Sequence, residues 1–244
     1  KEMPKRSSLD GNILGGGLSE YLVIPAWQII RMPHDVDMRH AALTEPLACC
    51  IHSIRKARLK FGDTVVIIGM GIMGYFHVKL AQMCGARIIV SETDEEKRKT
   101  AIREGAAYAF DPRQCDVGEE IRRLTDGLGA DAVINTIPFK KVWQQAIDML
   151  APYGRLIAYS SQNSKEPIGV DFGMVHSREI EFIGTLNPTI EDNQMAVKLI
   201  GYQMIDMEKV IDREFSFAQG KEAFDYACKP GVYRVMINYG KEDN

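Results

Sequence analysis

Three glycines have the spacing that lets a protein backbone approach a phosphate group. Gly69, Gly71 and Gly74 form a GxGxxG motif between the apolar run 64–68 and an amphipathic segment. In a strand–turn–helix unit the first glycine permits the turn, the second leaves room for a pyrophosphate, and the third lets the helix pack closely on the sheet. The helix N-terminus offers free N–H groups to phosphate oxygens. The motif therefore predicts dinucleotide binding, with Ile72 and Met73 in the same cradle.

An acidic residue follows the next apolar run. Glu92 lies 23 residues after Gly69 and directly after the predicted strand at 87–90. A carboxylate at this place can accept both hydroxyls of an adenosine ribose, and its charge repels a 2′-phosphate. The sequence therefore favours NAD over NADP, although Lys97 and Arg98 are near enough to weaken the preference. The alternative is a solvated acidic residue at a strand end, which the preceding glycine motif disfavours.

The elements that must position these residues alternate between strand and helix. This alternation predicts an α/β fold with a doubly wound parallel sheet of the Rossmann type. Strands are expected at 64–68, 87–90, 108–110, 132–135, 154–159 and 179–185, and helices at 46–58, 72–84, 95–104, 117–125 and 140–150.

The two ends of the chain differ from this pattern. Residues 1–20 are polar and glycine-rich and indicate a loop or connection, and 20–25 predicts a short strand that proline ends. The tail predicts helices at 190–204 and 220–228 and short extended segments at 214–217 and 233–238. These pieces indicate a return into a second, smaller domain.

The composition excludes several classes of protein. A formal net charge of −3 argues against nucleic acid or an anionic membrane as partner. We expect no bilayer span, because no apolar run approaches about 20 residues, and no signal peptide at the polar start. The five cysteines lack CxxC spacing, which indicates reduced thiols rather than a disulfide framework or zinc finger. The expected location is the cytoplasm.

Several segments together resemble the medium-chain dehydrogenase/reductase family, specifically its zinc-dependent alcohol and sorbitol dehydrogenase-like members. The resemblance runs from about residue 15 to the end, in family order and spacing. The segments that carry it are 16–21 (GGLSEY), 42–48 (ALTEPLA), the dinucleotide motif, 127–134 (GLGADAVI), 223–227 (AFDYA) and 233–235 (YRV).

The resemblance implies that a catalytic zinc activates the hydroxyl of an alcohol or polyol while NAD takes the hydride. Glu45 matches the family's glutamate that faces this zinc. An equally supported alternative is a helix N-terminal carboxylate that the helix dipole stabilises. Cys49 and Cys50 are interpreted as ordinary thiols, because they point to different faces of a helix.

Five further positions match coenzyme-binding places in the family. Arg234 matches an arginine that reaches the pyrophosphate, with an exposed strand-edge arginine as the alternative. Thr136 and Ile137 match the wall of the adenine pocket, and Tyr159 and Ser160 match the approach to the nicotinamide. These places follow predicted strands, where ligands of open α/β sheets bind.

The sequence departs from the family in lacking the upstream cysteine and Gly-His-Glu zinc ligands. Since a catalytic zinc takes three protein ligands, we expect these residues alone to bind coenzyme without turnover, and we assign no catalytic residue. The start on lysine suggests a fragment. The expected division is 1–44, a remnant of the mostly β catalytic domain with its connection; 45–205, the dinucleotide-binding domain; and 206–244, a segment returning to the catalytic domain.

Two alternatives stay open: a zinc-independent NADPH-dependent reductase of the same superfamily, and a non-catalytic NAD(H)-binding module. The choice of substrate is not encoded in the segments present. The resemblance implies a homodimer or homotetramer that pairs through the edge strand near Ile180–Thr185. An apolar edge strand left open would also be an aggregation hazard.

Overall fold

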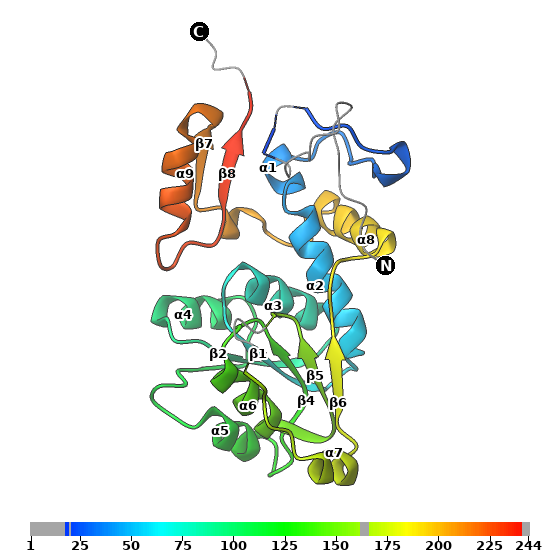
Figure 1. The fold of residues 1–244 in the computed structure, drawn as a ribbon, viewed down its shortest axis with the longest axis vertical. Helices are drawn as coiled ribbons and strands as arrows, with labels where there is room; N and C mark the ends of the chain where they lie inside the picture. Colours follow the sequence, from blue (N-terminus) through cyan, green and yellow to red (C-terminus); the bar gives the residue numbers. More distant parts are fainter. Residues whose placement is uncertain (1–17, 20, 162–165, 241–244) are drawn as a thin grey trace.

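A six-stranded parallel sheet forms the centre of the computed structural model, which describes residues 18–19, 21–161 and 166–240 (Figure 1). The strand order is β3-β2-β1-β4-β5-β6, so the direction of winding reverses between β1 and β4. The strands are β1 (Thr64–Ile68), β2 (Arg87–Ser91), β3 (Tyr108–Phe110), β4 (Ala130–Asn135), β5 (Leu150–Ala158) and β6 (Glu181–Gly184).

Helices cover both faces of this sheet. The helices on one face are α2 (Thr44–Ala57), α3 (Ile72–Met83) and α4 (Glu95–Arg103), and those on the other are α5 (Val117–Leu124), α6 (Lys140–Asp148) and α7 (Phe172–Arg178). Strand β1 supplies both cores, because Val65 and Ile67 point to the first face and Val66 and Ile68 to the second. The apolar run 64–68 is therefore fully buried, as the sequence predicted.

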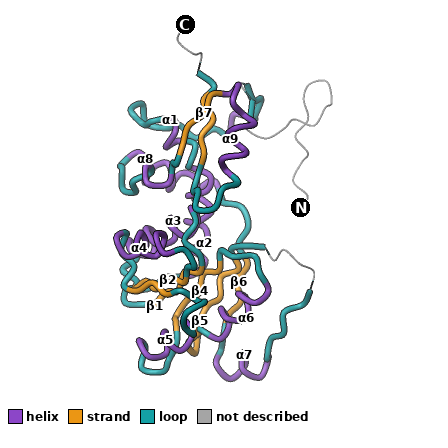
Figure 2. Tube along the Cα trace, turned by 90° about the vertical axis from the view of Figure 1, so that its left-hand side faces the viewer, coloured by secondary structure: helices purple, strands orange, loops and turns teal. Residues whose placement is uncertain are grey.

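A second group of elements lies to one side of the sheet and its covering helices, in the upper part of Figures 1 and 2. Helix α8 (Ile190–Gly201) packs on α2, and β7 and β8 form a separate parallel pair with α9 beside it. The bounds are η1 (Ala26–Gln28), α1 (Met38–Ala41), η2 (Glu208–Val210), β7 (Arg213–Ser216), η3 (Phe217–Gln219), α9 (Gly220–Ala227) and β8 (Val235–Asn238). Within the described ranges, no helix is both long and apolar enough to cross a membrane.

The predicted doubly wound sheet is confirmed, with strand and helix bounds that differ by a few residues. The strand expected at 20–25 is wrong, since 21–25 forms no strand. Tyr21 and Val23 are largely exposed, and a strand without a neighbour is not stable alone. Helices α1 and α7 were not predicted. The loop expected at 1–20 lies outside the described residues, apart from 18–19.

Asp192 joins α8 to α2. Its carboxylate is fully buried and accepts hydrogen bonds from Arg55 (2.6 Å), His52 (2.8 Å) and the Thr189 hydroxyl (2.7 Å). Burial alone would raise the pKa of Asp192, but a hydrogen bond from the Thr189 amide (2.8 Å) together with these three outweighs it and lowers the pKa to about 2. His52 is therefore part of a structural network that fixes the helix carrying Glu45.

We expect this network to make stability depend on acid pH. Because the pKa of Asp192 is lower in the folded chain than the value of about 3.9 in an unfolded one, its stabilisation is complete above about pH 5 and is lost as pH falls toward 2. The full contribution is about 2–3 kcal/mol, of which about half is lost by pH 3. Urea unfolding at pH 7 and pH 3 should therefore show a smaller pH effect in Asp192→Asn than in the parent. Equal pH effects in the two proteins would contradict this role.

Candidate functional site

The three motif glycines surround the turn between β1 and α3. Gly69 has φ +92°, and a Cβ added there would lie 2.6 Å from Thr136 Oγ1. A Cβ at Gly74 would lie 2.0 Å from the carbonyl oxygen of Gly69, so α3 packs directly against the turn. A Cβ at Gly71 would meet no atom within 4 Å. Gly71, whose Cβ position has open space around it, is thus the residue that the motif places against the pyrophosphate. The cradle therefore fits a dinucleotide.

Glu92 lies at the edge of this glycine turn. One carboxylate oxygen accepts a hydrogen bond from the Met70 amide (2.7 Å), and the other accepts from the Asp94 amide (2.9 Å) and the Thr93 hydroxyl (3.1 Å). The side chain is half-buried. These contacts hold the carboxylate beside the phosphate cradle, where an adenosine ribose would accompany a pyrophosphate.

Two arginines lie next to Glu92. Arg98 Nη1 donates to the carbonyl oxygen of Glu92 (2.8 Å), and Arg113 donates to that of Thr93. Both guanidinium groups also contact Asp111, and hydrogen bonds from Arg113 together with the charge of Arg98 hold the pKa of Asp111 well below its usual range. The positive charge next to Glu92 is therefore partly neutralised by Asp111.

The ends of β4 and β5 meet the glycine turn from the other side. The Thr136 hydroxyl donates to the carbonyl oxygen of Ile68 (2.7 Å), and Ile137 Cδ1 lies 2.8 Å from the Cβ position at Gly69. Tyr159 Oη lies 3.0 Å from Met73 Sδ, and the Ser160 amide donates to the carbonyl oxygen of the last residue of β4. The sheet thus brings the predicted residues of four strand ends to one edge.

A cluster of buried side chains packs against this edge of the sheet. His77 is fully buried between the Met73 carbonyl oxygen (2.7 Å) and the Ser53 hydroxyl (2.9 Å), and its ring stands edge-on to Tyr159. Burial lowers the pKa of His77 to about 4, so the imidazole is neutral at pH 7. Burial likewise raises the pKa values of Tyr159 and Cys50 far above neutrality. These three side chains are therefore uncharged at pH 7.

Glu45 is exposed in the first turn of α2, and Cys49 Sγ donates to its carboxylate across 3.3 Å. Burial, followed by the Glu45 charge, raises the pKa of Cys49 to about 12. Of the described side chains, one cluster has three possible ligand atoms within 4.8 Å of one another: Asp37, His40 and Glu208. Glu45 is not part of this cluster, so among the described residues no three-ligand zinc site forms around Glu45.

The C-terminal segment carries the last predicted position. The Arg234 amide donates to Asp212 (2.8 Å), and Arg234 Nε is buried without a hydrogen-bond partner in the described part of the chain. The neighbouring Tyr233 was not singled out from the sequence, although its ring lies 4.8 Å from the Lys97 ammonium. The signal that could have identified Tyr233 is its position next to Arg234, which the sequence already assigned to the coenzyme. Asn135, which is fully buried with an unpartnered Nδ2, was also missed.

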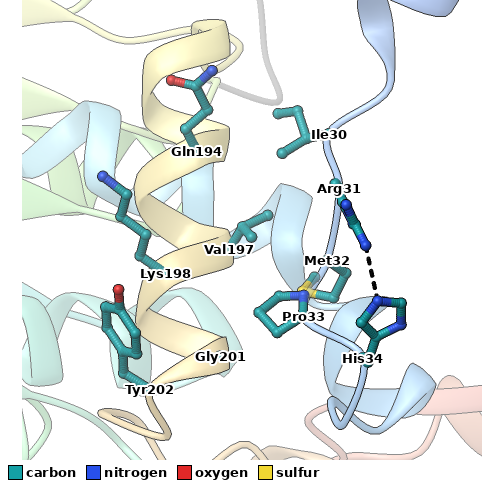
Figure 3. A pocket seen from close by; sticks show the side chains of 10 residues that line it. All are labelled: Ile30, Arg31, Met32, Pro33, His34, Gln194, Val197, Lys198, Gly201 and Tyr202. Atoms are coloured by element: carbon teal, nitrogen blue, oxygen red, sulfur yellow. Dashed lines mark hydrogen bonds between the residues drawn. The ribbon is translucent and has the colours of Figure 1, made fainter.

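A groove of about 440 Å³ lies away from this site, between the segment 30–34 and α8 (Figure 3). Arg31 and His34 hydrogen-bond to each other along it (2.9 Å). No predicted site residue lines this groove, and it has no glycine turn or strand end. Its lining consists of Ile30, Arg31, Met32, Pro33, His34, Gln194, Val197, Lys198, Gly201 and Tyr202.

Curated relatives include several polyol dehydrogenases. The chain is 29% identical to sorbitol dehydrogenase of Halalkalibacterium halodurans, over 93% of this chain and 66% of that protein. It is 26% identical to D-arabitol-phosphate dehydrogenase of Enterococcus avium, over 98% of this chain and 68% of that protein. The chain thus spans about two thirds of the length of these relatives.

Solved structures show the same fold. A putative zinc-binding dehydrogenase from Sinorhizobium meliloti, bound to NADP, is 28% identical with a TM-score of 0.86, covering 93% of this chain and 67% of that one. An alcohol dehydrogenase from E. coli, complexed with NADH, is 21% identical with a TM-score of 0.84, covering 94% and 68%, and this likeness concerns the fold alone. The family model described as zinc-binding dehydrogenase matches residues 72–201, just over half of the chain. The chain therefore belongs to the zinc-binding dehydrogenase family and contains its coenzyme-binding part.

Proposed function

We propose that this chain is the coenzyme-binding portion of an NAD-dependent oxidoreductase that transfers a hydride from an alcohol or polyol to NAD with zinc assistance. The observation that carries the proposal is the position of the Glu92 carboxylate, which hydrogen-bonds to the Met70 amide beside the open cradle at Gly71. A carboxylate there accepts ribose hydroxyls and repels a 2′-phosphate. The names of the curated relatives support a polyol substrate.

Within this proposal each residue has a defined task. The glycine turn, with Ile72 and Met73, holds the pyrophosphate; Glu92 and Lys97 take the adenosine ribose; Thr136 and Ile137 form the adenine-pocket wall. Tyr159 and Ser160 lie at the approach to the nicotinamide, and Arg234 reaches the pyrophosphate. Glu45 faces the metal, and zinc would need further ligands beyond the described residues.

We also propose that 1–44 and 206–244 belong to the catalytic domain and that 45–205 is the dinucleotide-binding domain. The separate β7–β8 pair supports the second boundary.

Calorimetric titration with NADH and NADPH tests the coenzyme assignment. We expect NADH to bind at least tenfold more tightly, without turnover of an alcohol and polyol panel by the 244-residue chain. Preference for NADPH would contradict the proposal. The protein produced by the native gene, loaded with zinc, should reduce NAD with one of these substrates. Coenzyme binding without hydride transfer by that protein would instead support a non-catalytic NAD(H)-binding module.

A second candidate is an NADPH-dependent, zinc-independent reductase. It is favoured by the arginines next to the ribose position, since Arg98 and Arg113 could bind a 2′-phosphate, and by a structural relative that is bound to NADP. The NADPH titration separates this candidate from the first.

We expect the chain to associate through the edge strand β6. Phe182 on this strand is 44% exposed, and the strand has a hydrogen-bonded neighbour on one side within the described sheet. Phe182→Lys places a charge on this open edge, which should block pairing with a second copy. Light scattering should show a dimer or tetramer for the parent and a monomer for the variant. A parent that is monomeric at micromolar concentrations would contradict this prediction.

A further inference from the structure

The dipeptide Tyr233–Arg234 is fixed at the start of β8 by one carboxylate. Asp212 Oδ2 accepts hydrogen bonds from the amides of Tyr233 (2.5 Å) and Arg234 (2.8 Å), and the Asp212 amide donates to the Arg234 carbonyl oxygen (2.8 Å). Because this clamp uses only backbone groups of the dipeptide, both side chains are free to serve another purpose.

The Tyr233 ring extends to helix α4 of the dinucleotide-binding domain. The Lys97 ammonium lies 4.8 Å from the ring centroid, which is a cation–π distance. Among the described residues this ammonium has no carboxylate or hydrogen-bond partner. Lys97 lies in the first turn of α4, which begins three residues after Glu92, so the contact places the Tyr233 ring near the N-terminal end of α4.

The Tyr233 hydroxyl has no partner of its own. Its oxygen is buried and makes no hydrogen bond to a described residue, and the same is true of Arg234 Nε. Burial, followed by the charges of Glu92, Asp212 and Asp94, raises the pKa of Tyr233 to about 12, so the hydroxyl remains a donor at neutral pH. Buried donors are rarely left unpaired, because an unpaired group has lost its hydrogen bonds to water without replacing them. Two such donors on adjacent residues, one of them on a ring that the Glu92 charge reaches, indicate a missing acceptor.

We propose that Tyr233 is a further coenzyme-binding residue, whose hydroxyl donates a hydrogen bond to an oxygen of the adenosine ribose or its phosphate. Its ring meanwhile holds the Lys97 ammonium next to the same group. Ribose and phosphate supply the acceptor oxygens that these donors lack. The inference deepens the proposed function and rests on it.

Tyr233→Phe removes the hydroxyl and retains the ring. Tyr226→Phe is a matched control, because Tyr226 lies in the same C-terminal segment and also has a lysine ammonium 4.8 Å from its ring, that of Lys229. Each protein would be titrated with NADH and with AMP, which carries only the adenosine ribose and its phosphate, and the melting temperature would be measured without ligand.

We expect Tyr233→Phe to weaken binding of both NADH and AMP by about five- to tenfold, the effect of one lost hydrogen bond. Its melting temperature without ligand should be unchanged or higher, because an unpaired buried hydroxyl is removed. Tyr226→Phe should match the parent in all three measurements. NADH and AMP affinities of Tyr233→Phe within twofold of the parent, or a lowered melting temperature with the weaker binding, would overturn this inference alone. A parent that binds no NADH would contradict the proposed function as well.

Discussion

Gly74→Ala is expected to destabilise the chain by about 2 kcal/mol and to abolish measurable coenzyme binding. The new Cβ would lie 2.0 Å from the carbonyl oxygen of Gly69, a backbone atom that cannot move alone. Overpacking of this kind costs about 1–3 kcal/mol or more, whereas alanine gains only about 0.5–1 kcal/mol over glycine inside a helix. Helix α3 must therefore shift away from the turn, which deforms the cradle. Thermal unfolding should show a melting temperature about 6 °C lower.

Gly71→Ala is the matched control, because it adds the same methyl group three residues earlier. Its Cβ would meet no protein atom within 4 Å, and Gly71 has φ −72°, which alanine adopts without strain. The melting temperature should therefore equal that of the parent while NADH binding weakens about tenfold or more, since the methyl group occupies space needed by the pyrophosphate. Parental NADH affinity in Gly71→Ala would show that phosphates do not bind at this turn.

Glu92→Gln is expected to reduce the preference for NADH over NADPH by about 100-fold. The carboxylate would lose charged hydrogen bonds to the ribose hydroxyls, worth about 1.5–3 kcal/mol and thus about 10–100-fold in affinity. Repulsion of a 2′-phosphate would disappear at the same time, leaving Arg98 and Arg113 to attract it. Titration of the variant with both coenzymes gives this ratio directly.

Glu96→Gln serves as the control for charge alone. Glu96 is exposed in the first turn of α4 and pairs with Lys99 (2.8 Å), so it has the charge of Glu92 without its contact to the glycine turn. The coenzyme ratio of this variant should be within twofold of the parent. A ratio that falls equally in both variants would attribute the preference to net charge rather than to the Glu92 position.

The strands were predictable because a strand that is buried on both faces is apolar at nearly every position. The run 64–68 is apolar after Thr64 and forms β1 with the same bounds, and 108–110 forms β3. The strand expected at 20–25 failed because β-branched and aromatic residues indicate a strand only where a neighbouring strand pairs with them. The short helices α1 and α7 have four and seven residues, too few to show a helical period.

The site was predictable where it depends on local backbone. Glycine spacing and an acid at the next strand end located the cradle and Glu92, whereas Tyr233 reaches Lys97 across 136 positions of sequence. Such a contact depends on how the C-terminal segment folds back, which no local pattern encodes. The link between Asp192 on α8 and the two basic residues of α2 was hidden for the same reason.

Amide chemical shifts of the isotope-labelled chain during titration with NAD test the central claim most directly. We expect the largest changes at Met70, Gly71, Ile72 and Glu92, whose amides border the glycine turn and the ribose position. Little change is expected along the groove between the segment 30–34 and α8. Unchanged signals at the glycine turn, or changes concentrated in that groove, would contradict a dinucleotide site at the end of β1.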